Sequence, residues 1–342
     1  MLVKDAKNVA SEWVNKEASN ISGFIGAFFH GSINYLSDSS SFPENSDVDL
    51  MIVVNDKVSL EDKIGKFIYK DILLEVSYIS KSELKSPEKV LSTYHLAGSF
   101  RTSSVILDPS GKLTEIQSVV SANFNKSKWV LKRCEHAREK IIHNYEIDKK
   151  DSFPDQVNSW LFPAGITTHI LLVAGLKNPT VRKRYIEVKK LLIQYNKLDL
   201  YPDLLELLGC KSIKRKTVEY YLDKLANAFD DAKRIITTPF FFASDISDNA
   251  RHVAIDGSRK LIERGYHREA IFWMLATYTR CQKIFIQDGT QEIQNKHNFS
   301  YHGFLSCLGI NSYKDLDQKS QEVKNMLPEI WKVAEDIIEL NS

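Results

Sequence analysis

The sequence predicts an α+β protein in which a mixed sheet flanked by helices is followed by an all-α helical bundle. Its 342 residues are enough for two domains of the usual size, roughly 100–200 residues each. Up to about residue 125 strand-like runs alternate with helical ones, and beyond it apolar residues recur every three or four positions. We therefore expect a first domain over residues 1–125 and a helical domain over residues 126–342.

Short apolar runs bounded by turn residues predict the strands of the first domain. They cover residues 48–54, 72–79 and 103–107, and the small apolar stretch 21–29 is expected to lead into a further buried strand. The turn sequence DPSG at 108–111 follows the last run. These runs supply the strands of the expected sheet.

Two helices are expected in the same domain. Ser59, followed three residues later by Asp62, resembles a capping box at the start of a short amphipathic helix. The apolar residues of that helix are Leu60, Ile64, Phe67 and Ile68. Residues 82–97 form the second expected helix.

Apolar stripes of helical spacing mark the second domain. One consists of Val130, Cys134, Ala137, Ile141 and Tyr145, and a longer one of Val218, Leu222, Leu225, Phe229, Ala232 and Ile236. This spacing suits helices packed nearly parallel in a bundle. Pro154 and Pro202 are expected in first turns of helices, where proline is tolerated.

Composition argues against a nucleic-acid-binding protein, a zinc protein and a membrane protein. The formal net charge is only +2, whereas a protein that grips a nucleic acid normally has a large basic excess, so we expect no nucleic-acid partner. The four cysteines are far apart and form no CxxC pair, which argues against a zinc site. No signal-peptide core and no apolar run near the roughly 20 residues of a membrane span are apparent, so we expect a cytoplasmic protein with no membrane contact.

Two aspartates at the start of the strand 48–54 are the first candidate functional residues. In a strand, Asp47 and Asp49 project to one face while the apolar residues between and after them point to the other. Like charges held side by side repel strongly unless a cation compensates them. Because oxygen-only ligands favour Mg²⁺ or Mn²⁺, the pair indicates a divalent metal site.

A third carboxylate and a glycine strengthen this interpretation. Glu75 lies in the strand 72–79 and joins the aspartates on one face if that strand pairs beside 48–54, and three carboxylates can support two metal ions. Gly31 leaves room for close approach of a phosphate to the backbone, and Ser32 adds a hydroxyl donor. A Gly-Ser pair alone is more often a plain turn, and an acid on a half-exposed strand is common.

In this order, Gly31-Ser32, a polar loop, Ser46-Asp47-Val48-Asp49 and the strand with Glu75, the sequence resembles the polymerase-beta-type nucleotidyltransferases. The resemblance covers roughly the first 125 residues, and the ILDPSGKL stretch is similar to the end of this domain in antibiotic nucleotidyltransferases. The helical remainder is similar in kind to the bundle of aminoglycoside and lincosamide nucleotidyltransferases. The loop after Ser32 is slightly long for the family.

The resemblance implies a fold and a reaction. The first domain would be the nucleotidyltransferase domain, and an acceptor hydroxyl would attack the α-phosphorus of a nucleoside triphosphate, with ATP as the expected donor, releasing pyrophosphate. Asp47, Asp49 and Glu75 would hold two Mg²⁺ ions, with Mn²⁺ as an alternative. Gly31, Ser32, Ser46 and Arg101 would bind the nucleotide. The expected acceptor is a small hydroxylated molecule such as an antibiotic.

Several points stay open from the sequence. The general base is either Glu75 or an acid of the helical domain, Glu135 or Glu139. The acceptor could instead be RNA or a protein, or the chain could be a non-catalytic nucleotide-binding or regulatory module of the same fold. The identity of the acceptor and of the triphosphate, the oligomeric state and the role of the Ser-rich loop 33–46 are not determined. The basic residues at 182–190 and 211–216 fit the solvent face of helices.

Overall fold

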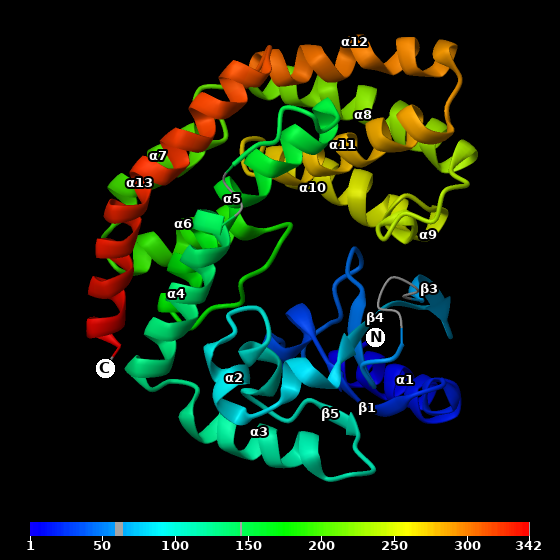
Figure 1. Cartoon of the computed structure of the whole chain (residues 1–342), viewed down its shortest axis with the longest axis vertical. Coiled ribbons are helices and arrows are strands. Elements are labelled where there is room, and N and C mark those ends of the chain that lie inside the picture. Colours follow the sequence, from blue (N-terminus) through cyan, green and yellow to red (C-terminus); the bar gives the residue numbers. More distant parts are fainter. Residues whose placement is uncertain (59–63, 144–145, 342) are drawn as a thin grey trace. The chain divides into compact units, whose positions relative to one another are not determined.

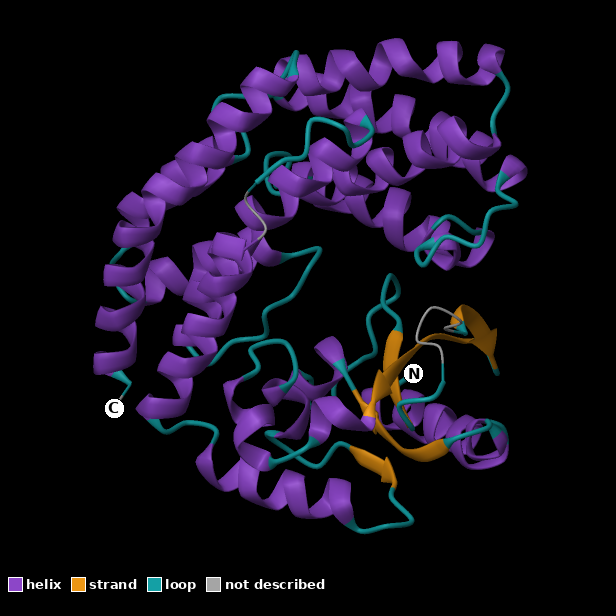
Figure 2. Ribbon diagram, viewed as in Figure 1, coloured by secondary structure: helices purple, strands orange, loops and turns teal. Residues whose placement is uncertain are grey.

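The computed structural model describes residues 1–58, 64–143 and 146–341 (Figures 1 and 2). The chain divides into two compact units, Met1–Arg133 and Cys134–Asn341. Within the described residues, the strands all lie in the first unit and the second unit is helical. The expected α+β class, a mixed sheet flanked by helices and then a set of helices, is confirmed. The division falls within helix α4 (Ser127–His143), and residue 125 lies in the turn before this helix.

The sheet has five strands in the order β3-β4-β2-β1-β5. They are β1 (Phe24–Phe29), β2 (Val48–Val54), β3 (Gly65–Tyr69), β4 (Ile72–Ser80) and β5 (Val105–Leu107). The central pair β2 and β4 is parallel, whereas β1 pairs antiparallel with β2 and β5, and β3 pairs antiparallel with β4. The predicted strands 48–54 and 72–79 therefore lie next to each other, as the candidate site requires.

The prediction of a helix from the pattern Leu60 to Ile68 is wrong for the part of that segment that the structure describes. Residues 65–69 form strand β3, because Lys70 and Asp71 take positive φ values of 46° and 65° and turn the chain in a two-residue hairpin. Pairing of β3 along β4 outweighs the weak helical spacing. The proposed cap residues Ser59 and Asp62, and Leu60 with them, lie outside the described residues.

The helix expected over 82–97 is much shorter in the structure. Helix α2 covers only Pro87–Ser92, and Ser86 caps it by accepting a hydrogen bond from the Lys89 amide. Single turns of 3-10 helix, Lys81–Leu84 and Ala97–Phe100, lie on either side. Pro87 cannot donate a backbone hydrogen bond, so it begins a helix and cannot continue an earlier one.

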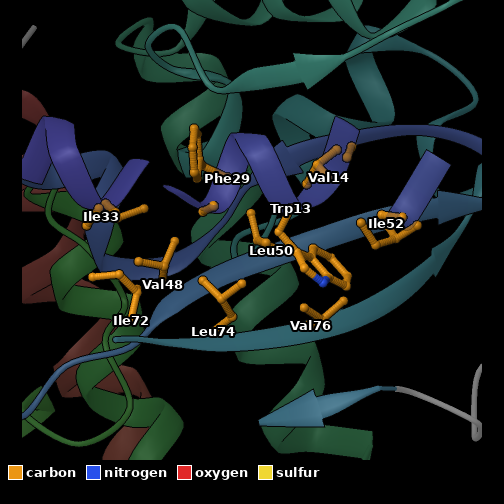
Figure 3. Close-up of a cluster of buried hydrophobic side chains, with 14 of the residues drawn as sticks. Trp13, Val14, Phe29, Ile33, Val48, Leu50, Ile52, Ile72, Leu74 and Val76 are labelled. Carbon is orange, nitrogen blue, oxygen red and sulfur yellow. The ribbon is translucent and has the colours of Figure 1, made fainter. Parts of the chain in front are cut away.

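Helix α1 (Val3–Lys16) covers one face of the sheet. Figure 3 shows Trp13 of this helix among Leu50, Leu74 and Val76 of the central strands. Alternate residues of β2 are completely or almost completely buried under the helix: Val48, Leu50, Ile52 and Val54. The side chains between them face away from α1, so alternation along β2 turns Asp49 to the opposite side.

The opposite side of the sheet is covered by the segment that follows β4. Phe28 of β1 packs against Phe100, with ring centroids 4.6 Å apart. Helix α3 (Lys112–Asn123) packs against α2 and against β5. Arg133, almost fully buried, donates to the carbonyl oxygens of Leu91 and Phe124 and so joins the start of α4 to this layer.

The Ser-rich loop after Ser32 is fastened to the beginning of α1. The Val3 amide donates to the Ser40 carbonyl at 2.9 Å, and the Phe42 amide donates to the Met1 carbonyl at 3.0 Å. Lys7 forms an ion pair with Asp38 at 2.7 Å. The long loop is therefore an ordered connection that runs from the Gly31 turn past the N-terminus to β2.

The second unit contains α5 to α13. Their bounds are α5 Phe153–Ala174, α6 Arg184–Gln194, α7 Tyr201–Leu207, α8 Arg215–Ile235, α9 Asp248–Arg251, α10 Gly257–Glu263, α11 Ile271–Asp288, α12 Gln291–Cys307 and α13 Tyr313–Leu340. The stripe predicted from Val218 to Ala232 is fully buried in α8, whereas Ile236 caps that helix. Pro154 and Pro202 stand in first turns, as predicted. Tyr145 lies outside the described residues.

Helix α5 corrects the expectation that no apolar segment approaches the length of a membrane span. It has 22 residues and is, by length and composition, the one helix in the described chain that qualifies. Within the second unit 78% of its apolar window is buried, chiefly against α13, α11 and α6. Its apolar character thus fits a central helix surrounded by other helices.

Candidate functional site

Three carboxylates meet on the face of the sheet opposite α1. The parallel register of β2 and β4 places Asp49 directly beside Glu75, and Asp47 stands just before β2 on the same side as Asp49. One oxygen from each of these carboxylates lies within 4.8 Å of the others. Side-chain alternation along β2 and the pairing of the two strands predict this grouping. A cluster of this kind can bind a metal ion.

Lys66 of β3 also enters this group and was missed from the sequence. Antiparallel pairing sets Lys66 opposite Glu75, and its ammonium donates to Glu75 Oε2 and, at 2.5 Å, to Asp47 Oδ2. The Lys66 side chain is 6% exposed. The two-residue turn is the feature of the sequence that could have revealed Lys66. If Tyr69 pairs with Ile72 across this turn, the antiparallel register pairs Lys66 with Glu75. Without a Gly or Asn at Lys70-Asp71, that turn is hard to recognise.

The carboxyl group of Asp49 has a shifted pKa in this cluster. Burial raises the pKa of its carboxyl well above the ordinary value, and the negative charges of Asp47 and Glu75 raise it further. The positive charge of Lys66 acts in the opposite direction but does not cancel these effects. Protonation of Asp49 is therefore easier in this site than in water. A divalent ion would favour the fully ionised form.

Gly31 lies against the Asp49 carboxylate. It begins a 3-10 turn, Gly31–Tyr35, with a φ of 64°, and a Cβ atom at this position would collide with Asp49 Oδ2. The His30 amide donates to the Asp49 carbonyl at 2.9 Å and fixes the turn to β2. Only glycine combines the left-handed backbone with this close approach. The two halves of the predicted motif are thus in direct contact.

His30 and Asn34 hold this turn in place. His30 Nδ1 is 2.7 Å from Ser99 Oγ, and burial lowers the pKa of His30 to about 4, so its ring is neutral at physiological pH. The Asn34 amide donates to the Phe29 carbonyl at 2.7 Å. His30 therefore supports the turn that begins at Gly31.

The remaining predicted nucleotide ligands lie around the same turn. Ser32 is its second residue and is partly buried. Ser46 precedes Asp47, and its hydroxyl reaches the Asp47 carbonyl at 3.5 Å, at the limit of a hydrogen bond. The Arg101 guanidinium lies over the Tyr35 ring, 4.6 Å from its centroid, at the other end of the turn that Gly31 begins. Arg101 is thus placed by stacking on this turn.

The two acids proposed as an alternative base belong to the second unit. Glu135 and Glu139 lie on α4 beyond the division between the units, Glu135 partly buried and Glu139 exposed.

The donor set fits a divalent cation. Asp47, Asp49 and Glu75 offer only oxygen atoms, which suit Mg²⁺ or Mn²⁺, and the Gly31 backbone lies directly against one of these carboxylates. Models of known protein families and curated protein sequences contain no match to this chain. The function of the site is therefore inferred from the arrangement of its residues.

Proposed function

We propose that the protein is a metal-dependent nucleotidyltransferase that transfers a nucleoside monophosphate from a triphosphate to a hydroxyl of a small molecule. The observation that supports this most strongly is the contact between Gly31 and Asp49 within a cluster of three carboxylates. It brings a turn able to receive phosphate next to ligands able to hold a cation. The resemblance of the Gly-Ser and Asp-x-Asp motifs to polymerase-beta-type nucleotidyltransferases points to the same reaction.

Each residue has a distinct task in this proposal. Asp47, Asp49 and Glu75 would hold one or two Mg²⁺ ions, which would polarise the α-phosphate and neutralise the triphosphate. The Gly31 backbone and the Ser32 hydroxyl would donate hydrogen bonds to the terminal phosphates. Arg101, kept in place by Tyr35, would add a positive charge. Glu75 would be either a third metal ligand or the base that takes the proton of the acceptor hydroxyl.

Lys66 must release at least one carboxylate when a divalent ion is bound. Its ammonium now occupies hydrogen-bonding positions on Asp47 and Glu75, and a metal ion would compete for the same oxygens. Released from them, the ammonium would be available to the negative charge of the triphosphate. This exchange keeps the carboxylates compensated both before and after metal binding.

The same contact favours a second candidate function. If Lys66 holds the carboxylates permanently, the protein would be a non-catalytic nucleotide-binding or regulatory module with the ammonium in place of a metal ion. The two functions differ in metal affinity. Titration with Mn²⁺, followed by electron paramagnetic resonance, separates them because the second function requires no binding to this cluster.

Transfer itself is tested with Mg²⁺, each labelled nucleoside triphosphate and a panel of hydroxylated antibiotics and sugars, scored by pyrophosphate release and product mass. The variants Asp47→Asn and Asp49→Asn should lose about a thousandfold in rate, equivalent to about 4 kcal/mol of transition-state stabilisation. The control is Asp71→Asn, since Asp71 is exposed in the hairpin turn and asparagine accepts its φ of 65°. Unchanged turnover in both test variants would refute the assignment.

A further inference from the structure

The helical unit contains a hollow of about 180 Å³ that is lined by residues of helices α5, α11 and α12. Five carboxamide side chains line it: Gln282, Gln291, Gln294, Asn295 and Asn298. The first comes from α11 and the others from α12. This concentration of amides lies entirely within the second unit and takes no part in the proposed metal chemistry.

Three amides of α12 lie on the same helix face as buried residues further along the helix. Gln291, Gln294 and Asn298 lead to Tyr301 and Leu305 in steps of three, four, three and four, the spacing of a face turned toward a bundle. Tyr301 and Leu305 are almost fully buried. One continuous helix face therefore changes from apolar to carboxamide where it reaches the hollow.

Gln282 supplies an independent indication of a ligand. Its side chain lines the hollow and is 4% exposed, yet its Nε2 atom has no hydrogen-bond partner. A buried amide without a partner is costly, and such groups in native proteins call for an explanation. A bound molecule with a hydrogen-bond acceptor opposite Nε2 would satisfy it.

The hollow is lined by uncharged side chains, some of them aromatic. In the part of the chain that the structure describes, its lining includes no Asp, Glu, Lys or Arg. Burial lowers the pKa of His302, which therefore stays neutral at physiological pH. Phe153 and His302 stack with centroids 4.9 Å apart and planes inclined by 8°. These features suit an uncharged planar ring and give a phosphate no partner.

We propose that this hollow binds a nucleobase, either free or as part of a nucleoside. Carboxamides pair with the adjacent donor and acceptor on the edge of a base, and aromatic side chains stack on its face. The volume is below the roughly 300–1,000 Å³ of pockets for drug-sized ligands and so suits a single ring system. The proposal holds whether or not the first unit transfers nucleotides.

The test uses the full chain in EDTA, so that divalent ions do not support binding at the carboxylate cluster. Free bases and nucleosides are titrated by calorimetry, with monosaccharides as the comparison class. We expect one base or its nucleoside to bind at one site, and its affinity to be the same in Asp49→Asn. Binding of monosaccharides alone, binding of no base, or loss of binding in Asp49→Asn would overturn the proposal.

Two variants locate the site. Gln282→Met, which removes the amide at similar length, should weaken binding about tenfold, the worth of a hydrogen bond to a buried group. Asn298→Ala changes an exposed position on the rim and should also weaken binding, so it decides the matter if Gln282→Met does not fold. Gln318→Met, on the exposed side of α13, is the matched control and should bind normally. Normal binding in a folded Gln282→Met and in Asn298→Ala would overturn the proposal.

Discussion

The Lys66 ammonium lies 2.5 Å from Asp47 Oδ2. Lys66 is a cation that compensates the charge of this cluster, and its side chain is almost fully buried. Removing one partner of a buried ion pair destabilises the fold far more than removing one partner of an exposed pair, because the remaining buried charge is not solvated. This relationship makes Lys66 the most informative residue of the site.

Replacing Lys66 by methionine should therefore destabilise the metal-free protein and favour metal binding. We expect Lys66→Met to lower the free energy of unfolding by about 3 kcal/mol in EDTA. Added Mn²⁺ should restore more stability than in the wild type, because it no longer competes with the ammonium. Urea unfolding with and without Mn²⁺ measures both effects.

The control for this variant is Lys70→Met. Lys70, in the turn after β3, pairs with Glu12 of helix α1 but is 55% exposed, so its removal should change the free energy of unfolding by less than about 1 kcal/mol. Equal losses in the two variants would show that the Lys66 contacts do not compensate the carboxylates.

Gly31→Ala tests the contact between the turn and Asp49. The new methyl group would meet Asp49 Oδ2 and would also require an unfavourable φ of 64°. We expect a loss of about 2–4 kcal/mol in the free energy of unfolding, combining backbone strain with overpacking. Nucleotide transfer should fall as well, because Asp49 must move.

Gly111→Ala separates these two costs. Gly111 has a φ of 75°, but a Cβ atom there would have nothing within 4 Å. Its replacement should therefore cost only the backbone term, about 1 kcal/mol, and leave transfer unchanged. Thermal unfolding and turnover are measured for both variants. Equal losses of stability and of transfer rate in Gly31→Ala and Gly111→Ala would contradict the contact between Gly31 and Asp49.

Glu75→Gln distinguishes the two roles left for Glu75. If Glu75 is a metal ligand, the variant should bind Mn²⁺ at least about tenfold more weakly, since a neutral amide replaces a carboxylate. If Glu75 is the base, metal affinity should persist while the transfer rate falls by roughly a hundredfold or more. Paired measurements of Mn²⁺ affinity and turnover assign the role, and a variant normal in both would exclude Glu75 from the site.

Asp231 should make the helical unit sensitive to acid. It accepts hydrogen bonds from Lys296 Nζ and His297 Nε2, both at 2.7 Å, and from Arg234. Burial alone would raise the pKa of Asp231, but these donors hold it at about 2, below the ordinary 3.8. A lowered pKa in the folded state gives stability above about pH 4 that is lost as the pH falls toward 2.

The measurement compares Asp231→Asn with the wild type by urea unfolding at several pH values. The wild type should be more stable near neutral pH, and the difference between the two should shrink between about pH 4 and pH 2. Asp223→Asn, at an exposed position of the same helix paired with Arg259, should show little of this effect. A difference that stays constant with pH would argue against the depressed pKa of Asp231.

Elements with strong local signals were predicted well. The strand 48–54 and the stripe of α8 each repeat one period over many residues, so that local pattern and burial agree. Strand β3 was mistaken for a helix because its few apolar residues fit both periods and its pairing with β4 decides the outcome. The expected helix over 82–97 failed for a different reason, the break imposed by Pro87.

Local sequence is enough to predict that Asp47 and Asp49 share a face and that Gly31 can adopt a backbone conformation that other residues avoid. Both follow from covalent geometry and side-chain alternation, which depend on a few neighbouring residues. Three relationships come from the folded chain: Glu75 lies beside Asp49, Lys66 reaches these carboxylates, and Gly31 contacts Asp49. These relationships depend on strand register and on close approach between distant segments, which local patterns do not specify.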